Sequence, residues 1–118
     1  MLSSLMVGLG GFIGANLRYW LGVALAERIN IPATFFINIA GALLIGILSG
    51  WAAKYNVNAQ AMLFLKVGLC GGFTTFSTFS LESLQMLQEG KITLALAYMA
   101  ASVILCVLAV YIGENMVR

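Results

Sequence analysis

The sequence contains few charged residues. Six Lys or Arg and four Asp or Glu residues make up 8% of the 118 positions, whereas a soluble domain carries roughly 25%. Hydrophobic residues make up 62% of the chain, and the mean hydropathy is +1.02. In water this composition would leave large apolar patches exposed and invite aggregation. The composition therefore indicates a protein whose solvent is the lipid bilayer.

Histidine is absent, and acidic residues are scarce. The four acids are Glu27, Glu82, Glu89 and Glu114. The chain therefore lacks the most common general base and the imidazole ligand of many metal sites. We expect neither an enzyme nor a nucleic-acid-binding protein. The two cysteines, Cys70 and Cys106, lie inside apolar runs and are interpreted as small buried side chains rather than as a disulfide.

Four apolar segments fill the chain. Each crossing of a bilayer takes ~20 apolar residues, so this length allows four spans joined by short loops. Asn30 and Pro32 mark the first loop. We expect one all-α transmembrane domain over residues 1–118. Its predicted spans are 2–26, 33–53, 59–88 and 92–113.

The third predicted span contains a polar interruption. Gly71 and Gly72 each weaken a helix by roughly 1 kcal/mol, and the threonines and serines that follow can satisfy freed backbone groups. A helix break at membrane depth is tolerated only inside protein or beside a wet cavity. Such a break also frees carbonyl oxygens, which suit a hard cation. We therefore expect a break within 71–79, in the middle of the membrane.

The first two spans carry polar side chains on one helix face. Arg18 follows Gly10 and Gly14 at intervals of four, and this glycine spacing lets helix backbones approach. Arg18 either snorkels toward the headgroups or places a positive charge at a vestibule. Thr34 and Asn38 lie one turn apart. Asn38 either makes an interhelical hydrogen bond or offers its amide N–H to a permeating anion.

The last two spans carry a hydroxyl stripe and a phenylalanine stripe. Tyr98, Ser102 and Cys106 recur every four residues, so they share one face of their helix. Ser102 either bonds back to its own helix or continues a wet track with the Tyr98 hydroxyl, in which the thiol is the weakest member. Phe76 and Phe79 either pack or turn their electropositive ring edges toward an anion.

Positive charge is balanced between the two ends of the predicted spans. Three basic residues fall toward each end: Lys54, Lys66 and Arg118 on one, Arg18, Arg28 and Lys91 on the other. With equal positive charge at both ends, the positive-inside rule does not assign the chain an orientation in the membrane. The balance reflects either weak bias in a small protein or dual topology, in which inverted copies pair with each other.

With these features the chain resembles the Fluc (CrcB-type) family of bacterial fluoride channels, over essentially its whole length. The resemblance rests on four stretches: Gly10-Gly11-Phe12-Ile13-Gly14, Arg18-Tyr19, Thr34 to Asn38 with Gly41, and Gly71-Gly72-Phe73-Thr74-Thr75-Phe76-Ser77-Thr78-Phe79-Ser80. The resemblance implies an inverted, antiparallel homodimer in the bacterial cytoplasmic membrane, with two fluoride pores and a central structural sodium ion.

The resemblance also implies roles for individual residues. It assigns the fluoride path to Asn38, Phe76, Phe79, Ser77, Thr78, Tyr98, Ser102 and Thr34. It places Arg18 at a vestibule, and the backbone carbonyls of Gly71 and Thr74 on the sodium ion. Glu82 matches an acid near the pore end without a fixed role, and Cys106 stands where some relatives have Ser or Thr.

The expected activity is passive fluoride export, because no nucleotide motif and no mid-span acid is present. The alternative from another class is a small dual-topology, proton-coupled drug exporter. Such a carrier needs a membrane-embedded carboxylate, and Glu82 is the only candidate.

Overall fold

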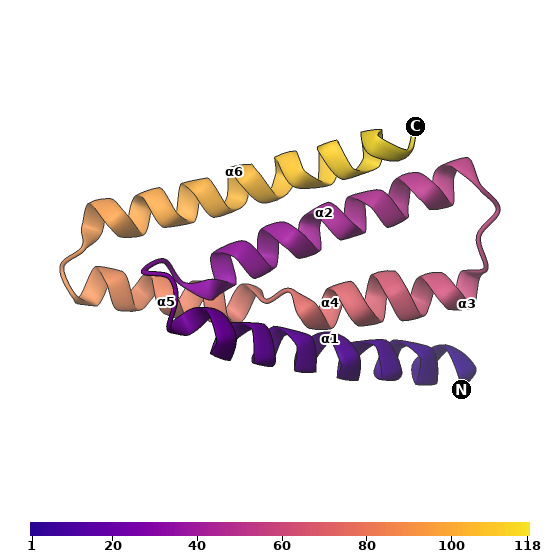
Figure 1. Cartoon of the computed structure of the whole chain (residues 1–118), viewed down its shortest axis with the longest axis horizontal. Helices are drawn as coiled ribbons and strands as arrows, with labels where there is room; N and C mark the ends of the chain where they lie inside the picture. The colour runs from indigo at the N-terminus through magenta and orange to yellow at the C-terminus, as the bar shows by residue number, and fades with distance from the viewer.

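The computed structural model describes residues 1–118 as four long helical segments without strands. In chain order the elements are α1 (Leu2–Ala26), α2 (Ala33–Lys54), α3 (Ala59–Met62), the π-helix η1 (Leu63–Cys70), α4 (Gly71–Phe73), α5 (Phe76–Gln88) and α6 (Ile92–Val117). The elements α3, η1, α4 and α5 follow one another along a single interrupted rod (Figure 1).

The four segments run alternately up and down. Both termini and the loop at 55–58 lie at one end of the molecule, and the loops at 27–32 and 89–91 lie at the other (Figure 1). Helix α2 packs along α6, and α1 packs along η1 and α4. The bundle therefore consists of two packed pairs: α2 with α6, and α1 with the first half of the interrupted third segment. The second half of that segment, α5, packs against α6 and so connects the two pairs.

Three segments are long and apolar enough to cross a membrane: Ala33–Lys54, Ala59–Gln88 and Ile92–Val117. Helix α1 has 25 residues but is not among them, since its serines, glycines and Arg18 lower its hydropathy. The all-helical class and the number of long helices match the prediction. The chain is thus a multi-pass membrane protein.

The helix bounds follow the predicted spans closely, with one extension. Helix α6 continues to Val117, past the predicted end at residue 113. The extra turn begins with the polar residues Glu114 and Asn115, and Arg118 and Glu114 form an ion pair of 2.7 Å across it. A polar last turn is expected where a helix leaves the apolar layer.

The interruption of the third segment is narrower than the predicted 71–79. Gly71 keeps α-helical angles, and only Thr74 and Thr75 adopt extended backbone before Phe76 begins α5. The break therefore lies inside the predicted range, and the two glycines that were expected to weaken the helix stay helical. Gly72 stays helical against α1, where a Cβ added to it would lie 2.7 Å from the carbonyl oxygen of Gly11.

Glycines set the distance between paired helices. A Cβ added at Gly10 or Gly14 would overlap the η1 backbone, at the carbonyl oxygens of Phe64 and Leu69 respectively. This confirms the predicted role of the two glycines in close helix approach. Glycines perform the same task between α2 and α6, at Gly46, Gly50 and Gly113.

We expect Gly14→Val to lower the free energy of unfolding by at least about 1–3 kcal/mol, the usual range for overpacking, because the added atoms meet backbone that cannot rotate away. Gly8→Val is the matched control, since an added Cβ at Gly8 meets nothing within 4 Å. Melting of the detergent-solubilised protein checks the pair. Equal melting temperatures for both variants would contradict the close contact.

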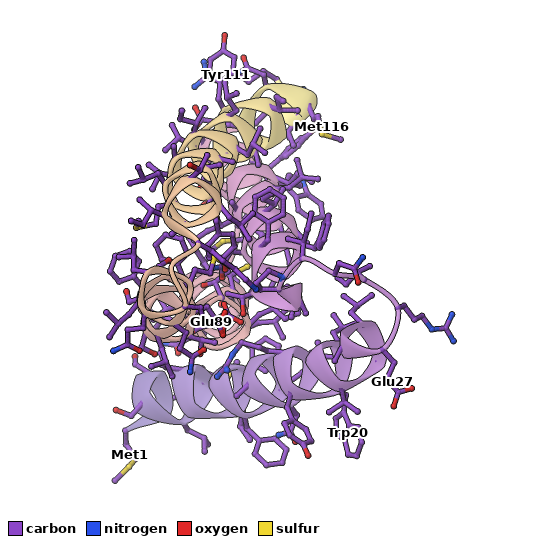
Figure 2. All side chains as sticks on the ribbon, turned by 90° about the vertical axis from the view of Figure 1, so that its left-hand side faces the viewer. Met1, Trp20, Glu27, Glu89, Tyr111 and Met116 are labelled. Carbon is purple, nitrogen blue, oxygen red and sulfur yellow. The ribbon has the colours of Figure 1, made fainter.

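The outer surface is apolar on several sides. Phe12, Trp20 and Tyr111 are each more than 60% exposed. Trp20, Tyr111 and Met116 point away from the other helices (Figure 2). Large exposed apolar faces suit lipid or a second protein surface rather than water.

Candidate functional site

Asn38 on α2 holds the interruption of the third segment. Its Nδ2 donates to the carbonyl oxygen of Thr75 at 3.0 Å, and its Oδ1 accepts from the amide N–H of Thr75 at 2.8 Å. One side chain therefore replaces the helical partners that the extended backbone has lost. Of the two sequence-based readings, the interhelical hydrogen bond is present. One N–H of the amide is still available to another acceptor.

Other groups satisfy the two helix ends that face the break. Arg18 donates from Nε to the carbonyl oxygen of Gly72 at 3.1 Å, which places a positive charge at the C-terminal end of α4. The Thr75 hydroxyl caps α5 by accepting from the amide N–H of Thr78 at 3.2 Å. Arg18 is half-buried, so it does not extend away from the bundle as a snorkelling side chain would.

The break leaves carbonyl oxygens without their helical donors. The amide of Thr75, four residues after Gly71, bonds to Asn38 instead of to Gly71. Thr74 has extended angles, so its own carbonyl leaves the helical pattern. Gly71 is exposed, and an added Cβ there would meet nothing within 4 Å. Two backbone oxygens near an open surface are thus free to accept a ligand.

Glu82 on α5 joins three segments. Its carboxylate accepts from the Thr34 hydroxyl at 3.1 Å and from the Tyr98 hydroxyl at 3.0 Å. The two hydroxyls assigned to the pore from the sequence are thereby oriented by an acid whose role the sequence left open.

Aromatic rings form a second connection between α5 and α6. The rings of Phe76 and Phe79 lie 5.5 Å apart, and those of Phe79 and Tyr98 lie 5.4 Å apart, both tilted by 44°. Phe79 is buried, whereas Phe76 is 76% exposed. Phe79 is therefore the inner ring of the pair, packed inside the bundle, and Phe76 is the outer ring, on the surface of the single chain.

Two hollows meet at the break. The first has a volume of about 400 Å³, and its predicted site residues are Asn38, Gly71, Thr74, Phe76, Phe79 and Ser102. The second has a volume of about 910 Å³, and its predicted site residues are Arg18, Thr34, Thr78 and Tyr98. Thr75 lines both hollows. The structure thus brings these residues into two adjoining groups.

Two predicted site residues behave differently from the rest. Ser77 lines neither hollow and is exposed beside Thr75, with their hydroxyl oxygens 3.3 Å apart. Ser102 is buried, and its Oγ has no hydrogen-bond partner, so it does not bond back to its own helix. An unpartnered buried hydroxyl costs free energy and is available to a ligand.

Comparison with known proteins identifies the family. A family model described as CrcB-like protein, Camphor Resistance (CrcB), matches residues 5–114. The chain belongs to the CrcB-like family. The resemblance inferred from the sequence motifs is therefore confirmed.

Curated members of the CrcB-like family are similar to this chain along nearly its full length. A protein named fluoride-specific ion channel FluC 1 from Nitrobacter hamburgensis is 44% identical, over 97% of this chain and 94% of its own. Proteins named fluoride-specific ion channel FluC from Hyphomonas neptunium and Phocaeicola vulgatus are 44% and 43% identical, over 97% and 96% of this chain and 94% and 96% of theirs.

Sequence reasoning missed two sets of contacts at the candidate site of this CrcB-like chain. It did not pair Glu82 with Thr34 and Tyr98, nor Asn38 with Thr75. A signal was available for Glu82, because a lone acid inside a span needs a donor partner. No comparable signal was available for Thr75, because it is one of several threonines and serines in the same stretch and nothing in the local sequence distinguishes it.

Proposed function

We propose that this protein is a passive, fluoride-selective channel that exports fluoride across the bacterial cytoplasmic membrane. The carrying observation is the near-full-length similarity to proteins named fluoride-specific ion channels. Membership of this family indicates a channel rather than an enzyme. The two adjoining hollows, with polar groups clustered at their junction, support a path through the bundle.

The chemistry of the hollows fits a small, strongly hydrated anion. A pore must replace the water of such an ion with donors and yet release it. In the first hollow, the spare amide N–H of Asn38 and the unpartnered Ser102 hydroxyl supply donors. The ring edges of Phe76 and Phe79 supply positive potential without a fixed cation. Arg18 contributes positive charge in the second hollow and thereby attracts anions.

We propose that two copies assemble in opposite orientations, so that each dimer has two pores. The exposed faces of the single chain support this arrangement. Phe76 and Gly71 line the first hollow and are both exposed in the isolated chain. A second copy would cover them and complete the wall of the hollow.

A central structural sodium ion fits the same face. The carbonyl oxygens of Gly71 and Thr74 have lost their helical donors, and hard oxygen ligands suit a hard cation. When bound, the ion would supply positive charge that holds freed carbonyls of two copies together. This chain contributes the carbonyl geometry, which Asn38 fixes through Thr75.

Efflux of fluoride from liposomes tests the function. Purified protein in liposomes should release trapped fluoride, recorded with a fluoride-selective electrode, without any imposed proton gradient. Chloride loading under the same conditions should give no comparable efflux. Release that requires a proton gradient, or no release by correctly folded protein, would overturn the proposal.

An experimental structure of the assembled protein tests dimer and sodium together. We expect a cation on a twofold axis, coordinated by the Gly71 and Thr74 carbonyls of both copies. Thr74→Ala should retain it, because the substitution removes the hydroxyl bonded to the Cys70 carbonyl at 2.9 Å and leaves the backbone oxygen. A parallel dimer, or a twofold axis without a cation, would contradict this assembly.

A further inference from the structure

Glu82 takes up the hydrogens of two hydroxyl groups in the second hollow. Its Oε2 accepts from the Thr34 hydroxyl at 3.1 Å, and its Oε1 accepts from the Tyr98 hydroxyl at 3.0 Å. A hydroxyl carries a single hydrogen, so neither group can donate to an anion while it donates to Glu82. Two hydroxyls that the family resemblance assigns to the fluoride path are therefore not free to bind fluoride in this arrangement.

The two hydroxyls converge on one place. Thr34 comes from α2 and Tyr98 from α6, and they are only 7% and 5% exposed. Both donate to the same carboxylate, so a small anion in the place of that carboxylate can accept from both. Buried polar groups are nearly always paired. The departure of Glu82 is therefore coupled to the arrival of another acceptor, an anion or water.

No basic side chain holds the Glu82 carboxylate in place. Of the basic residues that line the second hollow, Arg18 donates to the carbonyl oxygen of Gly72, and Lys91 forms an ion pair of 3.4 Å with Glu89. Glu82 has hydroxyl partners only, so no ion pair breaks when it moves. It lines a hollow of about 910 Å³, which leaves room for the side chain to turn aside.

We propose that Glu82 is a tethered competitor of the permeating anion. Fluoride in the second hollow takes over the hydroxyl bonds of Thr34 and Tyr98, and the carboxylate returns to them when the ion leaves. A conducting site must bind its ion and yet release it. The return of Glu82 favours release, because the two buried hydroxyls regain an acceptor as the ion departs. The role in release rests on the proposed channel function, and the exchange of acceptors does not.

Infrared difference spectroscopy of the reconstituted protein tests the exchange. Spectra taken in sodium fluoride and in sodium sulfate of equal ionic strength should differ in the carboxyl stretching bands, because the hydrogen-bond partners of Glu82 change. The difference should vanish in Glu82→Gln and remain in Glu27→Gln. Glu27 is the matched control, since it is exposed and lines neither hollow. No carboxyl difference in the wild type, or one that survives in Glu82→Gln, would overturn the exchange.

The concentration dependence of fluoride efflux from liposomes tests the competition. The amide in Glu82→Gln has only one acceptor oxygen, so at least one hydroxyl becomes free to bind the ion. The fluoride concentration that gives half-maximal efflux should fall by about tenfold, the effect of about one hydrogen bond. Glu27→Gln should leave this concentration unchanged. Melting in detergent establishes that each variant is folded.

The outcomes separate competition from a structural role and from the channel itself. If Glu82 only supported the fold, Glu82→Gln would melt earlier and slow efflux at every fluoride concentration, without lowering the half-maximal concentration. That result would overturn the competition. Glu82→Ala has no side-chain acceptor and should shift the half-maximal concentration in the same direction. A carboxyl difference in a wild type that shows no efflux would count against the channel function alone.

Discussion

Asn38→Leu should abolish fluoride efflux and destabilise the fold. The leucine removes both hydrogen bonds to the Thr75 backbone, and each buried group left unpaired costs about 1–3 kcal/mol. We therefore expect the free energy of unfolding to fall by at least about 2 kcal/mol. The break would also lose the contact that fixes the Gly71 and Thr74 carbonyls. Melting in detergent and efflux from liposomes measure the two effects.

Asn16→Leu is the matched control for this substitution. Asn16 is exposed on α1, and its Nδ2 donates only to the carbonyl oxygen of Phe12 one turn earlier. Its replacement should change stability by less than about 0.5 kcal/mol and leave efflux intact. Full efflux by Asn38→Leu would show that Asn38 neither holds the break nor faces the anion.

Replacing Phe76 and Phe79 with isoleucine should remove the ring edges while retaining apolar volume. An aromatic contribution of ~0.5–1.5 kcal/mol per ring, against 1.36 kcal/mol per tenfold in rate, predicts a loss of efflux of up to about tenfold for each substitution. The double variant should lose up to about a hundredfold on the same arithmetic, and at that limit its efflux falls near the background leak. Efflux rates from liposomes of equal protein content provide the measurement.

The two rings should differ in their effect on stability. Phe79 is 7% exposed and packs between Phe76 and Tyr98, so Phe79→Ile should cost on the order of 1 kcal/mol. Phe76 is 76% exposed, and its replacement should leave the melting of the single chain nearly unchanged. Phe12→Ile is the control, since Phe12 is 69% exposed on α1 and lines neither hollow. Undiminished efflux in the double variant would remove the rings from the path.

The local sequence determined the class of protein and most helix bounds. Scarce charge and long apolar runs are properties of the chain itself, so they gave the membrane setting and placed α1 and α2 within a residue of their observed ends. The position of the break in the third segment was harder to predict, because low helix propensity and packing against a neighbouring helix act on adjacent residues there. Gly71 and Gly72 have low helix propensity, yet both stay helical, and the backbone leaves the helix only at Thr74 and Thr75. Gly72 packs closely against Gly11 of α1, a contact that the local sequence does not reveal.

The residue roles in the fluoride path came from the family resemblance, and local physics alone left them open. Asn38, Ser102 and Arg18 each had two readings of similar standing. The structure decided the contacts of Asn38 and Arg18 by placing the Thr75 backbone and the Gly72 carbonyl beside them. It left Ser102 without a partner, which the local sequence gave no reason to expect.

What the sequence determined by itself was therefore an all-helical membrane protein with a weak point in its third segment. Only the tertiary structure decided which groups meet there. Asn38 bonds Thr75 across 37 positions, and Thr34 bonds Glu82 across 48. Such pairs depend on how far each helix is rotated and shifted along its neighbour. Close glycine contacts at Gly10, Gly14 and Gly46 help to set the rotation and shift of the paired helices. The periodicity of residues within one helix gives no information on how that helix is placed against its neighbour.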